Sequence, residues 1–132
     1  MRDRAPRTLL LAEDDNSLRN LAREVLEGDG YRVLAAERGE EALRLAASHE
    51  GAIDLLITDL IMPGMGGAEL VRRLEALRPG LATLFISGDA DGEIARSGVP
   101  GPRALFLQKP FSILEFVDAV SRALSAFAPA AA

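Results

Sequence analysis

Five short apolar segments alternate along the chain with longer segments in which apolar residues recur at helical spacing. The apolar segments cover residues 8–12, 32–36, 53–58, 83–87 and 104–108. Most of them are continuously apolar rather than alternating, which is typical of parallel strands with helices on both faces of the sheet. The pattern therefore predicts five buried strands.

The intervening segments predict amphipathic helices. Apolar residues recur every three or four positions within 18–26, 39–49 and 70–77. The last helix is predicted to begin after Ser112, because a serine hydroxyl can cap a helix while Glu115 reaches back to the first amide groups. Residues 92–102 contain three glycines and two prolines and leave room only for a short turn around 93–96.

Strands and helices that alternate in this way predict an α/β fold. Parallel strands need right-handed crossovers, which leaves few possible topologies. We expect a flavodoxin-like, doubly wound, five-stranded parallel sheet with the strand order 2-1-3-4-5 and helices on both faces. In such a sheet, ligands bind at the carboxyl ends of the strands, where the strand order reverses.

Composition narrows the class of protein. The 132 residues are 48% hydrophobic and 27% charged, which fits one domain over 8–127 with flexible ends at 1–7 and 128–132. No cysteine is present, so disulfides and cysteine-rich zinc sites are excluded. Neither a membrane span nor a signal segment is evident, and we expect a cytoplasmic location. A net charge of -5 disfavours direct binding to nucleic acid.

Polar side chains lie at or just after the predicted strand ends. These residues are Glu13, Asp14, Asp59, Ser87 and Lys109. The fold predicted from hydrophobicity brings them to one crevice, although they are far apart in the sequence. Three carboxylates in one crevice repel one another unless they hold protons or bind a cation, and a set of oxygen ligands suits Mg²⁺ or Mn²⁺.

The same residues suit phosphoryl transfer. Mg²⁺ in proteins keeps open positions that phosphate oxygens can take. Asp59 can act as the nucleophile and form an acyl phosphate, while the Ser87 hydroxyl and the Lys109 ammonium can hold the transferred oxygens. Lys109 is the only lysine in a chain otherwise rich in arginine, which indicates either a position where a compact ammonium is needed or the chance survival of one lysine.

Four segments resemble the signature regions of bacterial response-regulator receiver domains, in the same order. They read LLLAEDDNSLR, LLITDLIMPGMGG, LFISGDA and FLQKPFS, and the resemblance covers nearly the whole chain. It implies a phospho-accepting domain of two-component signalling that changes shape when it is phosphorylated. It also implies a histidine kinase or histidine phosphotransfer protein as donor, and a domain that is not a classical enzyme but phosphorylates and dephosphorylates itself with Mg²⁺.

The resemblance assigns a role to each matching position. Asp59 corresponds to the phosphorylated aspartate, Asp14 to the direct metal ligand, and Glu13 to an acid that acts through metal-bound water. The main-chain carbonyl of Ile61 completes the metal ligands. The remaining assignments are Ser87 as the switch hydroxyl, Lys109 as the cation, Phe106 as the aromatic ring that turns inward, and Pro110 as the residue after a cis peptide bond. Glu13, Ser87 and Phe106 replace the commoner Asp, Thr and Tyr.

Other interpretations have less support in the sequence. Haloacid-dehalogenase-type phosphatases need an acid two residues after the nucleophile, where this chain has Ile61. A nucleotide-binding module needs anion-binding amides after the first strand, where Glu13 and Asp14 would repel the anion. Gly64, Gly66 and Gly67 are interpreted as a flexible turn, and Asp15 as a helix cap rather than a metal ligand.

We expect the output signal to pass to another protein by direct contact. We expect a downstream protein to contact the surface around Phe106 and the final helix. The segment FLQKPFS and the glycine- and proline-rich stretch before it are similar to receivers of hybrid sensor kinases. A stand-alone regulator and an excised hybrid-kinase receiver both fit the sequence, as does a degenerate receiver that only binds proteins. The five polar residues at the strand ends argue against the last of these.

Overall fold

The fold is taken from a computed structural model of the chain, and the structure describes residues 6–88 and 103–127. The turn predicted around 93–96 lies outside the described residues, as do 1–5 and 128–132. The elements, in chain order, are β1 (Thr8–Ala12), α1 (Asn16–Gly28), β2 (Arg32–Ala36), α2 (Gly39–Ser48), β3 (Leu55–Asp59), α3 (Gly67–Leu77), β4 (Thr83–Ser87), β5 (Ala104–Gln108) and α5 (Ile113–Ala126).

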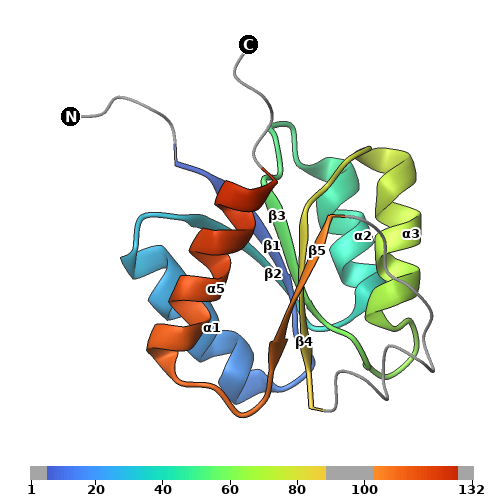
Figure 1. Cartoon of the computed structure of the whole chain (residues 1–132). Helices are drawn as coiled ribbons and strands as arrows, with labels where there is room; N and C mark the ends of the chain where they lie inside the picture. Colours follow the sequence, from blue (N-terminus) through green and yellow to red (C-terminus); the bar gives the residue numbers. More distant parts are fainter. Residues whose placement is uncertain (1–5, 89–102, 128–132) are drawn as a thin grey trace.

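The five strands form one parallel sheet in the order β2-β1-β3-β4-β5, which confirms the predicted topology. Helices α1 and α5 cover one face of the sheet, and α2 and α3 cover the other (Figure 1). Within the described ranges, no helix is long and apolar enough to cross a membrane.

Alternating residues of the central strands supply both cores. In β1, Leu9 and Leu11 pack towards α1 and α5, whereas Leu10 and Ala12 pack towards α2 and α3. All four side chains are at most 1% exposed. A strand that is buried on both faces needs apolar residues at every position, which explains the continuous apolar runs.

Side chains at the helix ends fix where α1 and α5 begin. Asp15 caps α1 by accepting a hydrogen bond from the Leu18 amide at 3.1 Å, so the predicted capping role is confirmed. The capping box predicted for α5 is also present, since Ser112 Oγ accepts from the Glu115 amide and Glu115 accepts from the Ser112 amide. These contacts satisfy amides that a helix leaves without partners in its first turn.

The predicted bounds of two elements, β3 and α2, were wrong by one or two residues. The third strand was predicted at 53–58, but β3 begins at Leu55 and extends to Asp59. Asp54 lies before β3 instead, and its carboxylate accepts a hydrogen bond from the amide of Thr8, the first residue of β1, at 2.8 Å. Pairing continues to the end of Asp59 because the next amide, of Leu60, donates to the Ile86 carbonyl. Helix α2 ends at Ser48, since His49 has an extended backbone.

Candidate functional site

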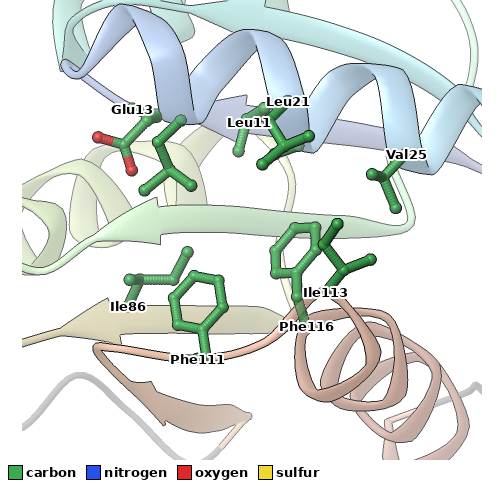
Figure 2. A pocket seen from close by; sticks show the side chains of 10 residues that line it. Leu11, Glu13, Leu21, Val25, Ile86, Phe111, Ile113 and Phe116 are labelled. Atoms are coloured by element: carbon green, nitrogen blue, oxygen red, sulfur yellow. The ribbon is translucent and has the colours of Figure 1, made fainter.

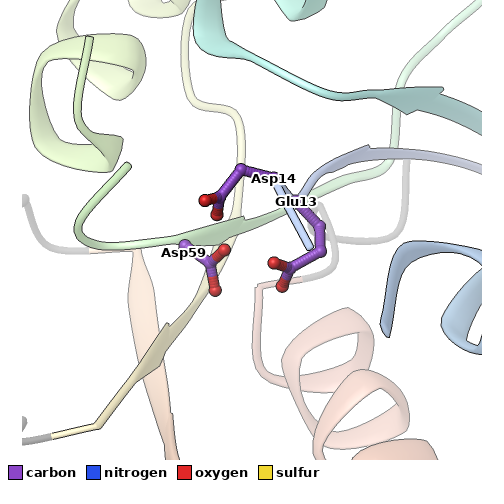
Figure 3. Close-up of side chains that lie close together, drawn as sticks. All are labelled: Glu13, Asp14 and Asp59. Atoms are coloured by element: carbon purple, nitrogen blue, oxygen red, sulfur yellow. The ribbon is translucent and has the colours of Figure 1, made fainter. Parts of the chain in front are cut away.

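The carboxyl edge of the sheet brings together the polar residues that the sequence placed at strand ends. Glu13 and Asp14 follow β1, Asp59 ends β3, Ser87 ends β4 and Lys109 follows β5. Strands β1 and β3 are neighbours, so the acids after β1 lie beside Asp59. Figure 3 shows the carboxylates of Glu13, Asp14 and Asp59 converging on one small region.

The three acids form a cluster in which one carboxylate oxygen from each lies within 4.8 Å of the others. Glu13 and Asp59 are buried, at 1% and 4% exposure, whereas Asp14 is exposed. Among the described residues, Glu13 Oε1 and both carboxylate oxygens of Asp59 are buried without a hydrogen-bond partner. Buried anionic oxygens without partners are costly, and an oxygen-preferring divalent cation would satisfy them. The donor set therefore fits Mg²⁺.

Burial and the neighbouring acids shift the pKa of Asp59. Burial, followed by the neighbouring Glu13 carboxylate, raises the pKa of Asp59 from 3.8 to about 9, and Lys109 opposes the shift. Without a cation, the folded protein therefore holds a proton on this group over a wide pH range. A divalent cation would compete with that proton for the same oxygens.

Lys109 lies on the other side of Asp59. Its Nζ is 3.4 Å from Asp59 Oδ1, which is an ion pair rather than a hydrogen bond. The Lys109 amide donates to the Ser87 carbonyl at 2.8 Å, and the Lys109–Pro110 peptide is cis, as the resemblance implied. Partial burial lowers the pKa of Lys109, but the carboxylates of Asp59 and Glu13 outweigh it, so the net shift is upward. The ammonium therefore remains charged beside the acids.

Ser87 and Phe106 lie on β4 and β5, the two strands between β3 and one edge of the sheet. Ser87 is 2% exposed and ends β4, one position beyond Ile86, which pairs with Asp59. Phe106 in β5 pairs with Phe85 in β4, and their rings stack with centroids 5.4 Å apart. Phe106 is nevertheless 38% exposed, so its ring lies at the surface of the sheet edge.

The loop after β3 contains a contact that the sequence interpretation missed. A Cβ on Gly67 would lie 2.3 Å from the main-chain oxygen of Asp59, so the N-terminus of α3 approaches the strand end too closely for any side chain. The Gly67 amide also donates to the Leu60 carbonyl. This glycine allows close packing, rather than only a flexible turn as predicted. Gly64, at φ +75°, fits the turn interpretation. Ile61, in the same loop, is 52% exposed.

An apolar cavity of about 70 Å³ opens beside the acids, between α1 and α5 (Figure 2). Glu13 lies at its inner end, and Leu11, Ile86, Phe111 and Phe116 form much of its wall. The Phe111 and Phe116 rings stack at 5.7 Å, which ties the loop after Lys109 to α5. Two apolar side chains of the lining are also exposed, Leu21 at 44% and Ile113 at 50%, and Leu114, the next residue of α5, is 80% exposed.

Comparison with known proteins identifies similar chains. The family model of the response regulator receiver domain matches residues 9–121. The response regulator receiver protein CpdR of Brucella abortus (strain 2308) is 36% identical over 118 residues, which cover 89% of this chain and 97% of that protein. The sensor kinase CckA of the same strain is 34% identical over 89% of this chain, but the matched part is only 12% of the kinase.

Solved structures of receiver domains are also similar to this chain. The receiver domain from the hybrid histidine kinase CckA has a TM-score of 0.75 and 35% identity, covering 89% of this chain and 98% of that one. The non-phosphorylated HemR receiver domain from Leptospira biflexa has a TM-score of 0.80 and 32% identity, covering 95% of this chain and 99% of that one. Both similarities extend over nearly the whole of each chain.

Proposed function

Because this chain belongs to the response-regulator receiver domain family, we propose that it accepts a phosphoryl group on Asp59 from a phosphohistidine of a partner protein. The observation that carries the proposal is the buried Asp59 carboxylate, which lies beside two further acids and Lys109 and whose two oxygens have no hydrogen-bond partner among the described residues. A buried aspartate at a strand end, with a cation on one side and an acid pair on the other, suits nucleophilic attack on a phosphoryl group.

The transfer exchanges one bond to phosphorus for another. A carboxylate oxygen of Asp59 attacks the phosphorus atom, the P–N bond to the histidine breaks, and the imidazole leaves with the electron pair and takes up a proton. Lys109, 3.4 Å from Asp59, stabilises negative charge on the phosphoryl oxygens. Ser87, at the end of the neighbouring strand, supplies a hydroxyl that can hold the same oxygens.

Glu13, Asp14, Asp59 and the main-chain carbonyl of Ile61 would hold Mg²⁺, with Mn²⁺ as a substitute. When bound, the cation neutralises the acids and stabilises charge on the transferred group. Glu13 is fixed for this role, because its Oε2 accepts from the Asp15 amide at 2.9 Å while Oε1 has no hydrogen-bond partner in the described structure. Asp14, which is exposed, offers its carboxylate from the solvent side.

Phosphorylation would change the surface through Ser87 and Phe106. Movement of Ser87 towards the phosphoryl group would vacate space next to the sheet edge, and Phe106, now stacked on Phe85 and partly exposed, would turn inward to fill it. We propose that a downstream protein reads this change through the Phe106 surface and α5. Phe106 has no hydroxyl, so the change would be read through packing alone.

The phosphohistidine donor is expected to dock over α1 and the start of α5. Leu21, Ile113 and Leu114 expose apolar surface there, next to the cavity that ends at Glu13. Exposed apolar patches of this kind mark protein interfaces. A donor helix bound on this face would bring its histidine to the edge of the sheet where Asp59 lies. The proposed donors are a histidine kinase or a histidine phosphotransfer protein.

The proposal is tested by incubating the protein with a small phosphodonor and Mg²⁺ and measuring a mobility shift on a phosphate-affinity gel. The domain should phosphorylate itself, lose the phosphoryl group again by hydrolysis, and do neither in EDTA. Asp59→Asn should abolish the shift. Asp118→Asn is the matched control, because Asp118 is an exposed aspartate in a surface ion pair with Arg122.

A shifted band in Asp59→Asn would place the phosphoryl group elsewhere and refute the assignment. The switch is tested separately by amide NMR with beryllofluoride and Mg²⁺. The signals of Ser87 and Phe106 should shift together with those of Asp59. Changes confined to the neighbourhood of Asp59 would support phosphorylation without the proposed switch.

A further inference from the structure

Arg19 links helix α1 to the acidic segment of the site. It lies in the first turn of α1 and is half-buried. Its Nη1 donates a hydrogen bond to the main-chain oxygen of Glu13 at 2.9 Å, and its Nη2 donates to Asn16 Oδ1. Both terminal nitrogens of the guanidinium are thus used to join the helix start to the residue after β1.

The charge of Arg19 is not explained by its own helix. The positive end of a helix dipole disfavours a cation in the first turn, and within the described residues Arg19 makes no ion pair with another side chain. For the stability of helix α1 alone, a shorter neutral residue would be more favourable at this position. The contact with Glu13 is the feature that gives the side chain a defined place.

Glu13 is held at three points. Its amide donates to the Ala36 carbonyl at 3.0 Å, its Oε2 accepts from the Asp15 amide at 2.9 Å, and its carbonyl accepts from Arg19. Among residues 6–88 and 103–127, its Oε1 has no hydrogen-bond partner. The Arg19 contact acts on the peptide between Glu13 and Asp14, so it constrains the direction of both acids.

We infer that Arg19 is a positioning residue for the metal site, which aims Glu13 and Asp14 at Asp59 without touching the cation. The inference rests on the proposed Mg²⁺ site. Residues that orient metal ligands from outside the ligand set commonly change affinity by about 10–100-fold when they are replaced. Nothing in the proposed phosphotransfer otherwise requires an arginine at this point of α1.

A purely electrostatic role for Arg19 predicts the opposite sign. Arg19 carries a positive charge and is bonded to the main chain of one of the three acids, so its removal would make the surroundings of the site more negative and tighten Mg²⁺ binding. A positioning role predicts weaker binding, because the acids lose their fixed direction. The direction of the change therefore separates the two explanations.

The test compares Arg19→Gln, Arg19→Lys and Arg23→Gln with the wild type. Arg23 lies one turn further along α1 in an exposed ion pair with Glu27 at 3.2 Å, so its variant controls for charge on the same helix. The first measurement is the Kd for Mg²⁺ from amide shifts of residues 13, 14 and 59. The second is hydrogen exchange at the Asp15 amide in EDTA, since that amide is bonded to Glu13 Oε2.

Arg19→Gln should raise the Kd for Mg²⁺ about tenfold or more and speed exchange at the Asp15 amide. Arg19→Lys should also weaken binding, because an ammonium does not reproduce the planar fork that reaches both Glu13 and Asn16. Arg23→Gln should leave both quantities close to wild type. Unchanged or tighter binding in Arg19→Gln would overturn the inference, as would an equal effect of Arg23→Gln or wild-type affinity in Arg19→Lys.

The two measurements separate failure of the inference from failure of the proposed function. If the wild type does not bind Mg²⁺, the proposed metal site is wrong. Exchange at the Asp15 amide without metal still reports whether Arg19 orders the acidic segment. If the wild type binds Mg²⁺ and Arg19→Gln binds it equally well with unchanged exchange, the positioning role fails and the metal site stands.

Discussion

Asp59→Asn is expected to stabilise the metal-free domain. The substitution keeps the shape of the side chain and removes a buried ionisable group from a cluster of acids. At an effective dielectric constant of ~20, two unit charges 4.8 Å apart repel by about 3.5 kcal/mol. Lys109 at 3.4 Å attracts Asp59 by about 5 kcal/mol on the same scale. Against two acids, this leaves a net repulsion of about 2 kcal/mol on the ionised Asp59 carboxylate, which the asparagine variant relieves at pH values where that carboxylate has lost its proton.

The stabilisation should depend on pH. The pKa of Asp59 is raised in the fold from 3.8 to about 9, so the folded state binds more protons than the unfolded state between these values. The free energy of unfolding of the wild type therefore falls as pH rises through this range, by at most about 1.4 kcal/mol per pH unit from this group. Asp59→Asn lacks this contribution, so the difference between the two proteins should widen with pH.

Chemical denaturation in EDTA, followed by circular dichroism at several pH values, measures this difference. Mg²⁺ should reverse the difference in stability between the two proteins. A ligand at a hundred times its Kd stabilises a folded protein by about 2.7 kcal/mol, and the variant lacks one of the proposed ligand oxygens. Asp118→Asn, an equal change of charge at an exposed position, should show neither effect. Parallel pH profiles for wild type and Asp59→Asn, or equal stabilisation of both by Mg²⁺, would refute the reasoning.

Substitutions at three other places test separate parts of the proposal. Ile61→Asn should speed hydrolysis of the phosphoaspartate several-fold, since an amide can orient water where an exposed hydrocarbon cannot; an unchanged decay rate would contradict this. Leu21→Glu should slow transfer from a phosphorylated partner but not from a small phosphodonor, whereas Leu77→Glu, at a similarly exposed position on α3, should affect neither. Gly67→Ala should lower the free energy of unfolding by about 2 kcal/mol or more in denaturation experiments, because the added Cβ would contact main-chain atoms. Gly28→Ala, with open space around its Cβ, should leave the free energy of unfolding nearly unchanged.

The topology and the composition of the site could be predicted because both follow from one pattern. Continuous apolar runs require a sheet covered on both faces, and parallel strands place all their carboxyl ends at one edge. Asp59 and Lys109 are 50 positions apart in the sequence, yet this rule alone brings them close. Their separation of 3.4 Å in the structure agrees with that expectation.

Features that depend on side-chain direction could not be predicted in the same way. Glu13 and Asp14 are adjacent and both acidic, but only Glu13 is buried. The target of the long Arg19 side chain depends on the angle between α1 and the end of β1. Gly67 has no side chain to suggest a role, and its close contact with Asp59 appears only when α3 is packed onto the strand end. Composition and spacing contain none of this geometry.

The rigidity of β3 connects the fold to the chemistry. Strand β3 is buried along its whole length, and Asp59 is its last residue. The next residue, Leu60, donates to Ile86 in β4 and accepts from Gly67 in α3, so the chain on both sides of the Asp59 carboxylate is fixed. A flexible loop would let the acids move apart in the absence of a cation. Because the strand prevents this, the three acids stay close together in the metal-free fold, where Asp59 keeps its proton, and a divalent cation that replaced this proton would meet oxygens already in place.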